Sequence, residues 1–578
     1  MLKLKNYLKD YKLQLTIGPL FKLLEAILEL IVPLVMSDII DNGISSGDKG
    51  FIYKSGIIMI IISAVGLLSA LICQASASVA SQGFGTKLRN VLFRHINSLS
   101  HAELDKLGTP TLITRMTNDV NQLQLAVAML IRLVIRAPFL IIGAIVMSVI
   151  ISPAMSVIFL ISAALIGLVL YLIMSRSIVF YKTIQKKLDR LSLLARENLS
   201  GNRVIRAFAK QKNEEKRFDE ASHEYVESSI SVGKLAALLD PLTYIIANAA
   251  IILIVLLSGK AVNIGTLHQG EIIALVNYMT QILLTMVVLA NLVVIFTKAS
   301  ASAARVNEVF ALSPSVRELN TEEIKVDKRK ETPQIEFKNV CFSYCGDEYD
   351  LNDISFKLYR GQRVGIIGGT GSGKSTLINL MPRFYDCNNG SILNDGADIK
   401  QYPFAQLRDQ FGIVPQKAVL FTGTIASNMR WKDKNASEEN IVKALKTAQA
   451  WEFVSALPDK LEAPVAQGGK NFSGGQRQRL TIARALTSEP EILILDDSAS
   501  ALDYATDAKL RAALNQLNKS MTVITVSQRV NSIRDCDIIL VLDDGKLVGS
   551  GTHEQLLESC NEYKEIYASQ TKSEEASA

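Results

Sequence analysis

Residues 368–376 read Gly-Gly-Thr-Gly-Ser-Gly-Lys-Ser-Thr, and this stretch decides the fold of the second half of the chain. Two glycines separated by four residues and followed by Lys-Ser form the P-loop pattern. The apolar run 364–367 precedes the loop and predicts a buried strand, while residues 377–380 after it suit a helix. A loop of this kind between a strand and a helix predicts an α/β nucleotide-binding domain.

The residue types of the loop suit the binding of a nucleotide phosphate. Glycines let backbone N–H groups turn toward the anion, and the following helix presents its positive N-terminal end. We predict that the loop binds ATP, with Lys374 near the β- and γ-phosphates and Ser375 on Mg²⁺. The predicted ATP-binding residues of the loop are Gly368, Gly369, Thr370, Gly371, Ser372, Gly373, Lys374, Ser375 and Thr376.

A second strand that ends in acids completes the predicted metal site. The segment 491–495, apolar after Glu491, leads into Asp496 and Asp497. A carboxylate at such a strand end can hold the water shell of Mg²⁺. We therefore predict that Asp496 acts on the metal together with Ser375.

The composition indicates a membrane domain before this soluble one. The chain has 578 residues, 49% of them hydrophobic, and the apolar excess lies in roughly the first 300. Windows of about twenty apolar residues are what a bilayer requires of a helix. Six windows qualify, at about 16–37, 55–80, 133–152, 154–178, 241–263 and 272–297. The third and fourth meet at Ser152-Pro153-Ala154, which predicts a tight hairpin.

The predicted fold class is an α-helical membrane domain of six long transmembrane helices plus an α/β P-loop nucleotide-binding domain with a helical insertion. Residues 1–12 interleave Lys with Leu and Tyr, which suits an amphipathic elbow helix on an anionic surface, although a frayed basic tail has the same composition. The expected divisions are 1–12 for the elbow, 13–305 for the membrane domain, 306–333 for a charged linker, 334–567 for the nucleotide-binding domain and 568–578 for a disordered tail.

The orientation follows from the loops. Six spans place both termini on one side, and the P-loop needs cytosolic ATP, so we expect both termini and the nucleotide-binding domain in the cytosol. The segments expected outside, 41–54, the Ser152 turn and 260–269, carry few basic residues, whereas 81–125 and 179–240 carry many. The inner segments have helical spacing, with breaks predicted at Gly108-Thr109-Pro110 and Ser200-Gly201-Asn202.

Charged residues in the apolar windows are costly unless paired or wetted. Glu25 and Glu29 share one face of the first span, and Arg132 and Arg136 share a face of the third, so an interhelical ion pair at matching depth is one expectation. These residues either line a water-filled substrate cavity or are interfacial. The six cysteines include no Cys-x-x-Cys pair, which predicts free thiols, and a net charge of +6 without a basic cluster beyond the membrane-facing loops does not favour nucleic acid.

The stretch Asn471-Phe472-Ser473-Gly474-Gly475-Gln476 resembles the signature motif of the ATP-binding cassette (ABC) family, usually Leu-Ser-Gly-Gly-Gln. The whole chain resembles a half-transporter of the exporter type (type IV fold). Tyr344 is similar to the adenine-stacking aromatic residue, Gln416 to the glutamine linked to the metal and to coupling, and Asp503 to the aspartate of the loop that crosses the dimer.

The resemblance implies a mechanism in which two nucleotide-binding domains meet head to tail. Each ATP then lies between one P-loop and the other chain's signature, so that Ser473, Gly474, Gly475 and Gln476 would act on ATP held by the partner. It also implies coupling helices near 105–111 and 199–206 that transmit closure to the membrane spans.

Two departures from the family pattern concern catalysis. Asp497 stands where the family usually has a glutamate that polarises the attacking water, and its carboxylate is one methylene shorter. Gln528 replaces the usual switch histidine and cannot supply an imidazolium charge. A milder change is Gln467, near a position where exporters often have Glu. The chain thus resembles the degenerate-site half of heterodimeric bacterial multidrug exporters.

The predicted function is ATP-driven efflux of amphipathic compounds across the cytoplasmic membrane by alternating access, with ATP and Mg²⁺ as cofactors. The expected partners are a second half-transporter, membrane lipids and a hydrophobic or amphipathic small molecule. The alternatives are a homodimeric lipid or peptide exporter, in which Asp497 and Gln528 suffice, and a non-transporting ATP-binding regulator or gated pore; the fusion of both domains in one chain disfavours an importer. Polar residues that suit a cavity or interhelical hydrogen bonds are Asn248, Asn277, Gln281, Asn291 and Lys298.

Overall fold

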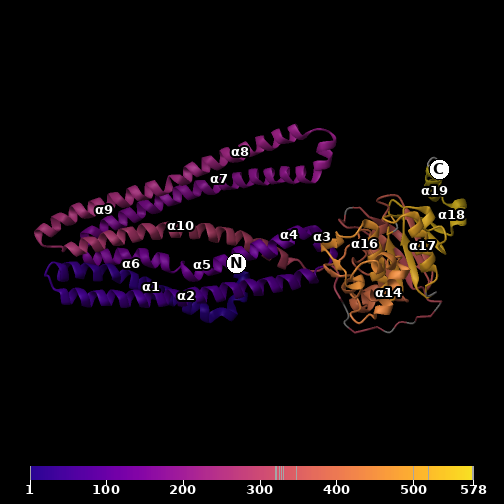
Figure 1. Ribbon diagram of the computed structural model, residues 1–578, viewed down its shortest axis with the longest axis horizontal. Helices are drawn as coiled ribbons and strands as arrows, with labels where there is room; N and C mark the ends of the chain where they lie inside the picture. Colours follow the sequence, from indigo (N-terminus) through magenta and orange to yellow (C-terminus); the bar gives the residue numbers. More distant parts are fainter. Residues whose placement is uncertain are drawn as a thin grey trace. The chain divides into compact units, whose positions relative to one another are not determined.

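The computed structural model describes residues 2–318, 322–324, 326, 328–329, 331–346, 348–498, 500–517 and 520–575. The chain divides into two compact units. The first comprises Met1–Asn97 and Thr109–Leu312, and the second comprises Ser98–Gly108 and Ser313–Ala578. The short segment Ser98–Gly108 therefore belongs with the soluble domain, although long helices precede and follow it in sequence (Figure 1).

The first unit is built from helices. They are η1 (Leu2–Tyr11), α1 (Lys12–Asp38), η2 (Ile39–Ile44), α2 (Lys49–Ser98), α4 (Thr109–Thr114), η3 (Arg115–Asp119), α5 (Val120–Arg132), α6 (Arg136–Ile151), α7 (Pro153–Ala207), α8 (Gln211–Ala237), α9 (Leu239–Ile264) and α10 (Gln269–Ala311). The predicted elbow is a 3-10 helix. Because α10 runs to Ala311, the helical domain extends beyond the predicted boundary at residue 305.

Among the residues that the structure describes, five segments are long and apolar enough to cross a membrane: Lys49–Ser98, Thr109–Ile151, Pro153–Ala207, Gln211–Ile264 and Gln269–Ala311. They hold five of the six predicted spans, and Ser152 alone separates α6 from α7, as the tight hairpin required. The remaining predicted span, 16–37, lies in α1, a 27-residue helix that carries Lys22, Glu25 and Glu29 within its apolar sequence.

The charges of α1 are paired. Arg136 Nη2 lies 2.7 Å from Glu29 Oε2, which confirms an interhelical ion pair between α1 and α6. Glu25 instead pairs with Lys22 of its own helix at 2.7 Å. Arg132 Nε is buried without a hydrogen-bond partner among the described residues. Pairing lowers the cost of a charge in an apolar environment, so the Glu29–Arg136 contact stabilises the packing of α1 against α6.

The predicted break at Ser200-Gly201-Asn202 is wrong. Helix α7 continues through it to Ala207, and the chain reverses at residues 208–210, where Ala209 has φ 51°. A glycine inside a helix costs only about 1 kcal/mol, which the packing of α7 along α8 outweighs (Figure 1). The predicted break at Gly108 is confirmed: this residue ends α3 (His101–Leu107) with φ 73°.

The described residues of the second unit form two larger sheets and a short strand pair. The six-stranded sheet has the order β12-β11-β3-β10-β9-β6, and the four-stranded sheet has the order β2-β1-β4-β5. The strands are β1 (Ile335–Phe342), β2 (Leu351–Leu358), β3 (Arg363–Gly368), β4 (Asn389–Asn394), β5 (Ala397–Asp398), β6 (Phe411–Val414), β7 (Gly423–Thr424), β8 (Pro464–Val465), β9 (Ile492–Asp496), β10 (Thr522–Val526), β11 (Ile538–Asp543) and β12 (Lys546–Gly551).

Helices cover these sheets and form the predicted insertion between β6 and β9. They are α11 (Lys374–Leu380), η4 (Ile399–Gln401), α12 (Phe404–Arg408), α13 (Ile425–Met429), α14 (Glu438–Thr447), α15 (Trp451–Ser455), η5 (Lys460–Glu462), η6 (Gln467–Gly469), α16 (Gly474–Thr487), α17 (Tyr504–Asn515), η7 (Val530–Ser532), α18 (His553–Ser559) and α19 (Asn561–Glu575). Strands β3 and β9 are continuous apolar runs with almost every residue buried, which is typical of parallel strands covered on both faces.

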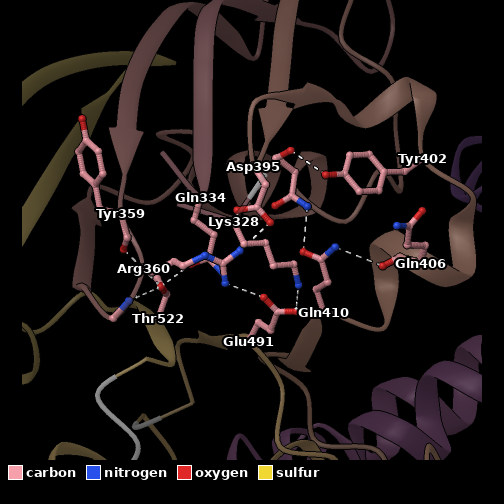
Figure 2. A network of polar contacts seen from close by, with 12 residues as sticks. Lys328, Gln334, Tyr359, Arg360, Asp395, Tyr402, Gln406, Gln410, Glu491 and Thr522 are labelled. Atoms are coloured by element: carbon pink, nitrogen blue, oxygen red, sulfur yellow. Dashed lines mark hydrogen bonds and ion pairs between the residues drawn. The ribbon is translucent and has the colours of Figure 1, made fainter. Parts of the chain in front are cut away.

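Two described residues in the C-terminal half of the predicted linker, Ile324 and Lys328, are bound to the soluble domain. Gln406 accepts a hydrogen bond from the Ile324 backbone N–H (2.9 Å) and donates one to the Ile324 carbonyl (2.7 Å). Lys328 donates to Glu491 at 2.5 Å, and Glu491 also pairs with Arg360 at 2.7 Å (Figure 2). The linker residues 319–321, 325, 327 and 330 lie outside the described residues.

Arg360 joins this network to the core. Its guanidinium lies 2.6 Å from the carboxylate of Asp395, whose side chain is only 1% exposed (Figure 2). Burial raises the pKa of Asp395, and the positive charge of Arg360 opposes this effect. The Arg360–Asp395 ion pair is thus largely removed from water. Loss of either partner would leave the other charge uncompensated, which destabilises the fold.

We predict that Asp395→Ala destabilises the second unit by about 3 kcal/mol, because it leaves Arg360 partly buried with one counter-charge removed. Both tryptophans, Trp431 and Trp451, lie in this unit, so their fluorescence in the full-length protein reports its thermal unfolding. The control is Glu489→Ala, which removes an exposed ion pair to Lys443 and should cost less than about 1 kcal/mol. Equal losses of stability in the two variants would contradict a stabilising role for the Arg360–Asp395 ion pair.

Candidate nucleotide-binding site

The topology of the six-stranded sheet brings the predicted site residues together. Strands β3, β10, β9 and β6 are neighbours and run parallel. Their carboxyl ends therefore meet at one edge of the sheet, where ligands of open α/β sheets bind. The P-loop follows β3, Asp496 ends β9, Gln528 follows β10 and Gln416 follows β6.

The P-loop owes its shape to glycine. Gly371 has φ 87° and Gly373 has φ 92°, values that other L-residues rarely adopt. A Cβ on Gly368 would lie 2.1 Å from the carbonyl oxygen of Leu542, whereas nothing lies within 4 Å of a Cβ on Gly369 or Gly371. The loop is thus pressed against β11 at Gly368 and open at the other two positions, as a phosphate cradle requires.

Backbone carbonyls and a serine hydroxyl of the P-loop hold the side chain of Lys374 over the loop. Its Nζ donates to the Gly368 carbonyl at 3.0 Å, to Ser372 Oγ at 3.2 Å and to the Gly369 carbonyl. Burial lowers the pKa of Lys374, while the carboxylates of Asp497 and Asp496 oppose the shift. The ammonium is therefore positioned where it can neutralise a bound phosphate.

The two acids after β9 have different partners. Ser375 Oγ donates to Asp496 Oδ2 at 3.4 Å, and Gln416 Nε2 donates to Asp497 Oδ2 at 3.4 Å. Burial raises the pKa of both aspartates, and the charge of Asp497 raises that of Asp496 further. A hydroxyl beside a carboxylate is a ligand set that suits Mg²⁺, so Ser375 and Asp496 fit the predicted metal role.

Asp497 and Gln528 lie at adjacent strand ends. Asp497 has φ 44°, a left-handed conformation that aspartate tolerates better than most residues, and its N–H donates to the Val526 carbonyl at 3.0 Å. Gln528 is exposed, directly after β10. The structure thus brings both substituted positions to the edge that carries the P-loop.

The loop at Gln528 is held by a residue that the sequence did not single out. Gln570 of α19 donates to the Gln528 carbonyl at 2.7 Å and accepts a hydrogen bond from the Val530 N–H at 2.9 Å. Residues 568–575 continue α19, so the prediction of a disordered tail is wrong for them, because Tyr563 and its neighbours anchor the helix to the core. Residues 576–578 lie outside the described residues.

Tyr344 presents a free ring face near the P-loop helix. Its ring is 48% exposed and stands edge-on to Phe342 and Tyr385, with centroid distances of 4.8 and 5.2 Å. Its hydroxyl donates to Thr376 Oγ1 at 3.4 Å. The ring is thus held by two aromatic neighbours, and the exposed part of the residue can stack on a planar base.

The signature begins helix α16 and caps it. Ser473 Oγ accepts from the Gln476 N–H at 3.2 Å, and Gln476 Oε1 accepts from the Ser473 N–H at 2.9 Å. Nothing lies within 4 Å of a Cβ on Gly474, whereas one on Gly475 would lie 3.2 Å from the Ala501 carbonyl. Among the described residues, no hydrogen bond joins the signature to the P-loop of the same chain.

Asp503 caps the N-terminus of α17, as Ser473 caps that of α16. It accepts hydrogen bonds from the N–H and hydroxyl of Thr506, both at 2.8 Å, and these bonds lower the pKa of its carboxyl group. Gln467 begins the short helix η6 and is exposed. Both residues therefore lie at the surface, as a role toward a second chain requires.

The first predicted coupling segment, 105–111, spans the end of α3 (His101–Leu107) and the start of α4. Helix α3 begins four residues before the predicted segment, because Ser100 and Glu103 form a capping box that fixes its start. The second segment, 199–206, lies within the uninterrupted helix α7.

Fold and site together define a P-loop nucleotide-binding domain fused to a helical membrane domain. The ABC transporter transmembrane region matches residues 15–286, and the ABC transporter domain matches residues 351–500. The chain belongs to the ABC transporter family. The predicted fold class and the predicted half-transporter organisation are confirmed.

Several relatives match the chain over nearly its whole length. An uncharacterised ABC transporter ATP-binding protein of Mycobacterium tuberculosis is 35% identical, covering 98% of each chain. An ATP-dependent lipid A-core flippase of Haemophilus ducreyi is 30% identical, covering 97% of this chain and 96% of the flippase. A solved bacterial Atm1-family ABC exporter with ATP bound superposes with a TM-score of 0.80 at 24% identity, covering 96% of this chain and 98% of that one. This last match shows that the fold is that of an ABC exporter.

We predict that Gly368→Ala abolishes nucleotide binding, because its Cβ would overlap the Leu542 carbonyl and displace the loop. The control is Glu489→Gln, an exposed change in the same domain outside the P-loop, which should bind nucleotide with an affinity within about threefold of the original chain. Equilibrium binding of a fluorescent ATP analogue to the full-length protein measures both. Intact binding by the Gly368 variant would show that the close approach to β11 is not required.

Proposed function

We propose that the chain is one half of an ATP-driven exporter of amphipathic compounds and that its own ATP site is the slow, degenerate site of a heterodimer. The proposal of a degenerate site depends on one observation: Asp497 and Gln528 both lie at the sheet edge that carries the P-loop. Aspartate is one methylene shorter than the glutamate usual in the family, and a misplacement of about 1 Å can cost on the order of a hundredfold in rate.

The geometry around Asp497 supports slow hydrolysis. Its carboxylate is hydrogen-bonded to Gln416, and a side chain one methylene shorter than glutamate reaches less far toward an attacking water. Gln528 offers an amide, which can hydrogen-bond a phosphate oxygen but carries no charge. Binding needs neither residue, because Lys374, the loop glycines and Tyr344 are intact.

The residues of this chain then divide the work. Tyr344 stacks on adenine, the loop and Lys374 hold the phosphates, and Ser375, Asp496 and Gln416 hold Mg²⁺, which neutralises phosphate charge when bound. The described residues contain no cluster of three His, Cys, Asp or Glu side chains that could hold a metal. Ser473, Gly474, Gly475 and Gln476 act on the partner's ATP, and Asp503 lies in the loop that crosses the dimer.

The membrane domain supports an amphipathic substrate. A groove of about 890 Å³ runs along α10 and the junction of α5 and α6, lined mainly by apolar side chains that include Leu130, Val134, Pro138, Leu289, Phe296 and Ser300. Gln281 of α10 has a buried Oε1 without a hydrogen-bond partner among the described residues. A relative named as a lipid A-core flippase supports lipid-like substrates. In this proposal both termini and the soluble domain lie in the cytosol.

A homodimeric lipid or peptide exporter is the second candidate, and the similarity to lipid flippases favours it. A non-transporting regulator is the third. Accumulation of a fluorescent amphipathic dye in inside-out vesicles, with ATP and against a gradient, separates export from regulation. ATP-independent equilibration of the dye would contradict export.

We predict that Asp497→Glu together with Gln528→His raises the ATPase rate of the assembled transporter or uncouples it from transport, because the two changes restore a longer carboxylate and a titratable imidazole. The measurement is phosphate release by the reconstituted complex. The control is Glu489→Gln, an exposed change on the same domain. Unchanged turnover with nucleotide still bound at this site would argue against Asp497 and Gln528 as the cause of degeneracy.

A further inference from the structure

Helix α3 is seated on an aromatic surface of the soluble domain. The ring of His101 lies 4.6 Å from that of Phe384 and 6.0 Å from that of Tyr385. Asp105, one turn later, accepts a hydrogen bond from the Tyr385 hydroxyl at 2.7 Å. These contacts lie within one compact unit, and α3 is continuous in sequence with α2 and α4 of the helical unit.

The same Tyr385 ring touches the proposed adenine site. It is 9% exposed and stands perpendicular to Tyr344, with an interplanar angle of 89° and a centroid distance of 5.2 Å. Phe342 contacts both tyrosines, at 4.8 Å from Tyr344 and 5.6 Å from Tyr385. One buried side chain therefore contacts α3 through its hydroxyl and the base-stacking ring through its edge or face.

The hydrogen bond to α3 is directional. Burial raises the pKa of Tyr385, and the bond to the Asp105 carboxylate raises it further, so the hydroxyl remains a donor at physiological pH. A bond from a neutral hydroxyl to a carboxylate is stronger than one between neutral groups. Rotation of Tyr385 away from Tyr344 would break this bond, because the same movement carries its hydroxyl away from Asp105.

We propose that Tyr385 is a positioning residue that links the docking of α3 to nucleotide binding at Tyr344. This inference rests on the proposed role of Tyr344 in stacking on adenine. If α3 docks, Tyr385 fixes the Tyr344 ring in its stacking position, and nucleotide affinity rises. By thermodynamic linkage, nucleotide on Tyr344 then strengthens the docking of α3 by the same factor.

The test is a thermodynamic cycle on the full-length protein in lipid nanodiscs, with the dissociation constant of mant-ATP and Mg²⁺ as the readout. Tyr385→Phe keeps the ring and removes the donor, and Asp105→Ala removes the acceptor. Each variant should weaken binding about fivefold, and the double variant should weaken it no more than either single one. Asp105→Asn keeps an acceptor oxygen, so its dissociation constant should stay within about twofold of that of the original chain.

Tyr402→Phe is the matched control. It removes a buried tyrosine hydroxyl with a hydrogen bond of the same length, 2.7 Å to the Asn394 carbonyl, in the same domain but outside the aromatic cluster, and it should leave binding unchanged. Hydrogen exchange supplies the reciprocal readout: mant-ATP should protect residues 98–108 in the original chain and not in Tyr385→Phe.

Additive losses in the double variant, unchanged binding in both single variants, or an equal loss in Tyr402→Phe would overturn the proposal. Failure of export is a separate result, since this cycle needs no transport: linkage with no ATP-driven accumulation would leave the role of Tyr385 standing and contradict the exporter. If the original chain bound no mant-ATP, both the nucleotide site and this link would be wrong.

Discussion

The parallel register of four neighbouring strands is the constraint on which the nucleotide site depends. Val523 to Val526 of β10 pair with Arg363 to Ile366 of β3, and β10 also pairs with β9. This pairing sets Asp496 and Gln528 at the edge that carries the P-loop. Ser375 can reach Asp496 across 121 residues of sequence only because the strand ends coincide.

Much of this site could be predicted from sequence because its determinants are local. The loop glycines, Lys374 and the acids after β9 lie within short patterns in which a strand, a turn and a helix follow one another. The contacts that Tyr385 and Gln570 make could not be predicted in this way. Their partners, Asp105 and the loop at Gln528, are 280 and 42 residues away, so only the packed structure shows that they meet.

The wrong predictions have a common physical origin. Ser200-Gly201-Asn202 has the composition of a turn, and the small, charged tail has that of a disordered segment. In both places the structure forms helix, because packing against α8 or against the core around Tyr563 outweighs weak local preferences. The start of α3 was misplaced for the opposite reason, since the capping box of Ser100 and Glu103 is a local signal that the proline and glycine nearby obscured.

A P-loop that keeps its glycines and Lys374, beside Asp497 and Gln528, is the central feature of this chain, and in our proposal it separates the binding of ATP from its hydrolysis. The most direct measurement is the ATPase rate of the chain purified alone and again as a complex with a co-expressed second half-transporter of its own organism, each with the subunit stoichiometry determined by native mass. The account predicts negligible hydrolysis alone and robust hydrolysis in a one-to-one complex. Robust hydrolysis by a homodimer of this chain would contradict it, because Asp497 and Gln528 would then suffice for catalysis.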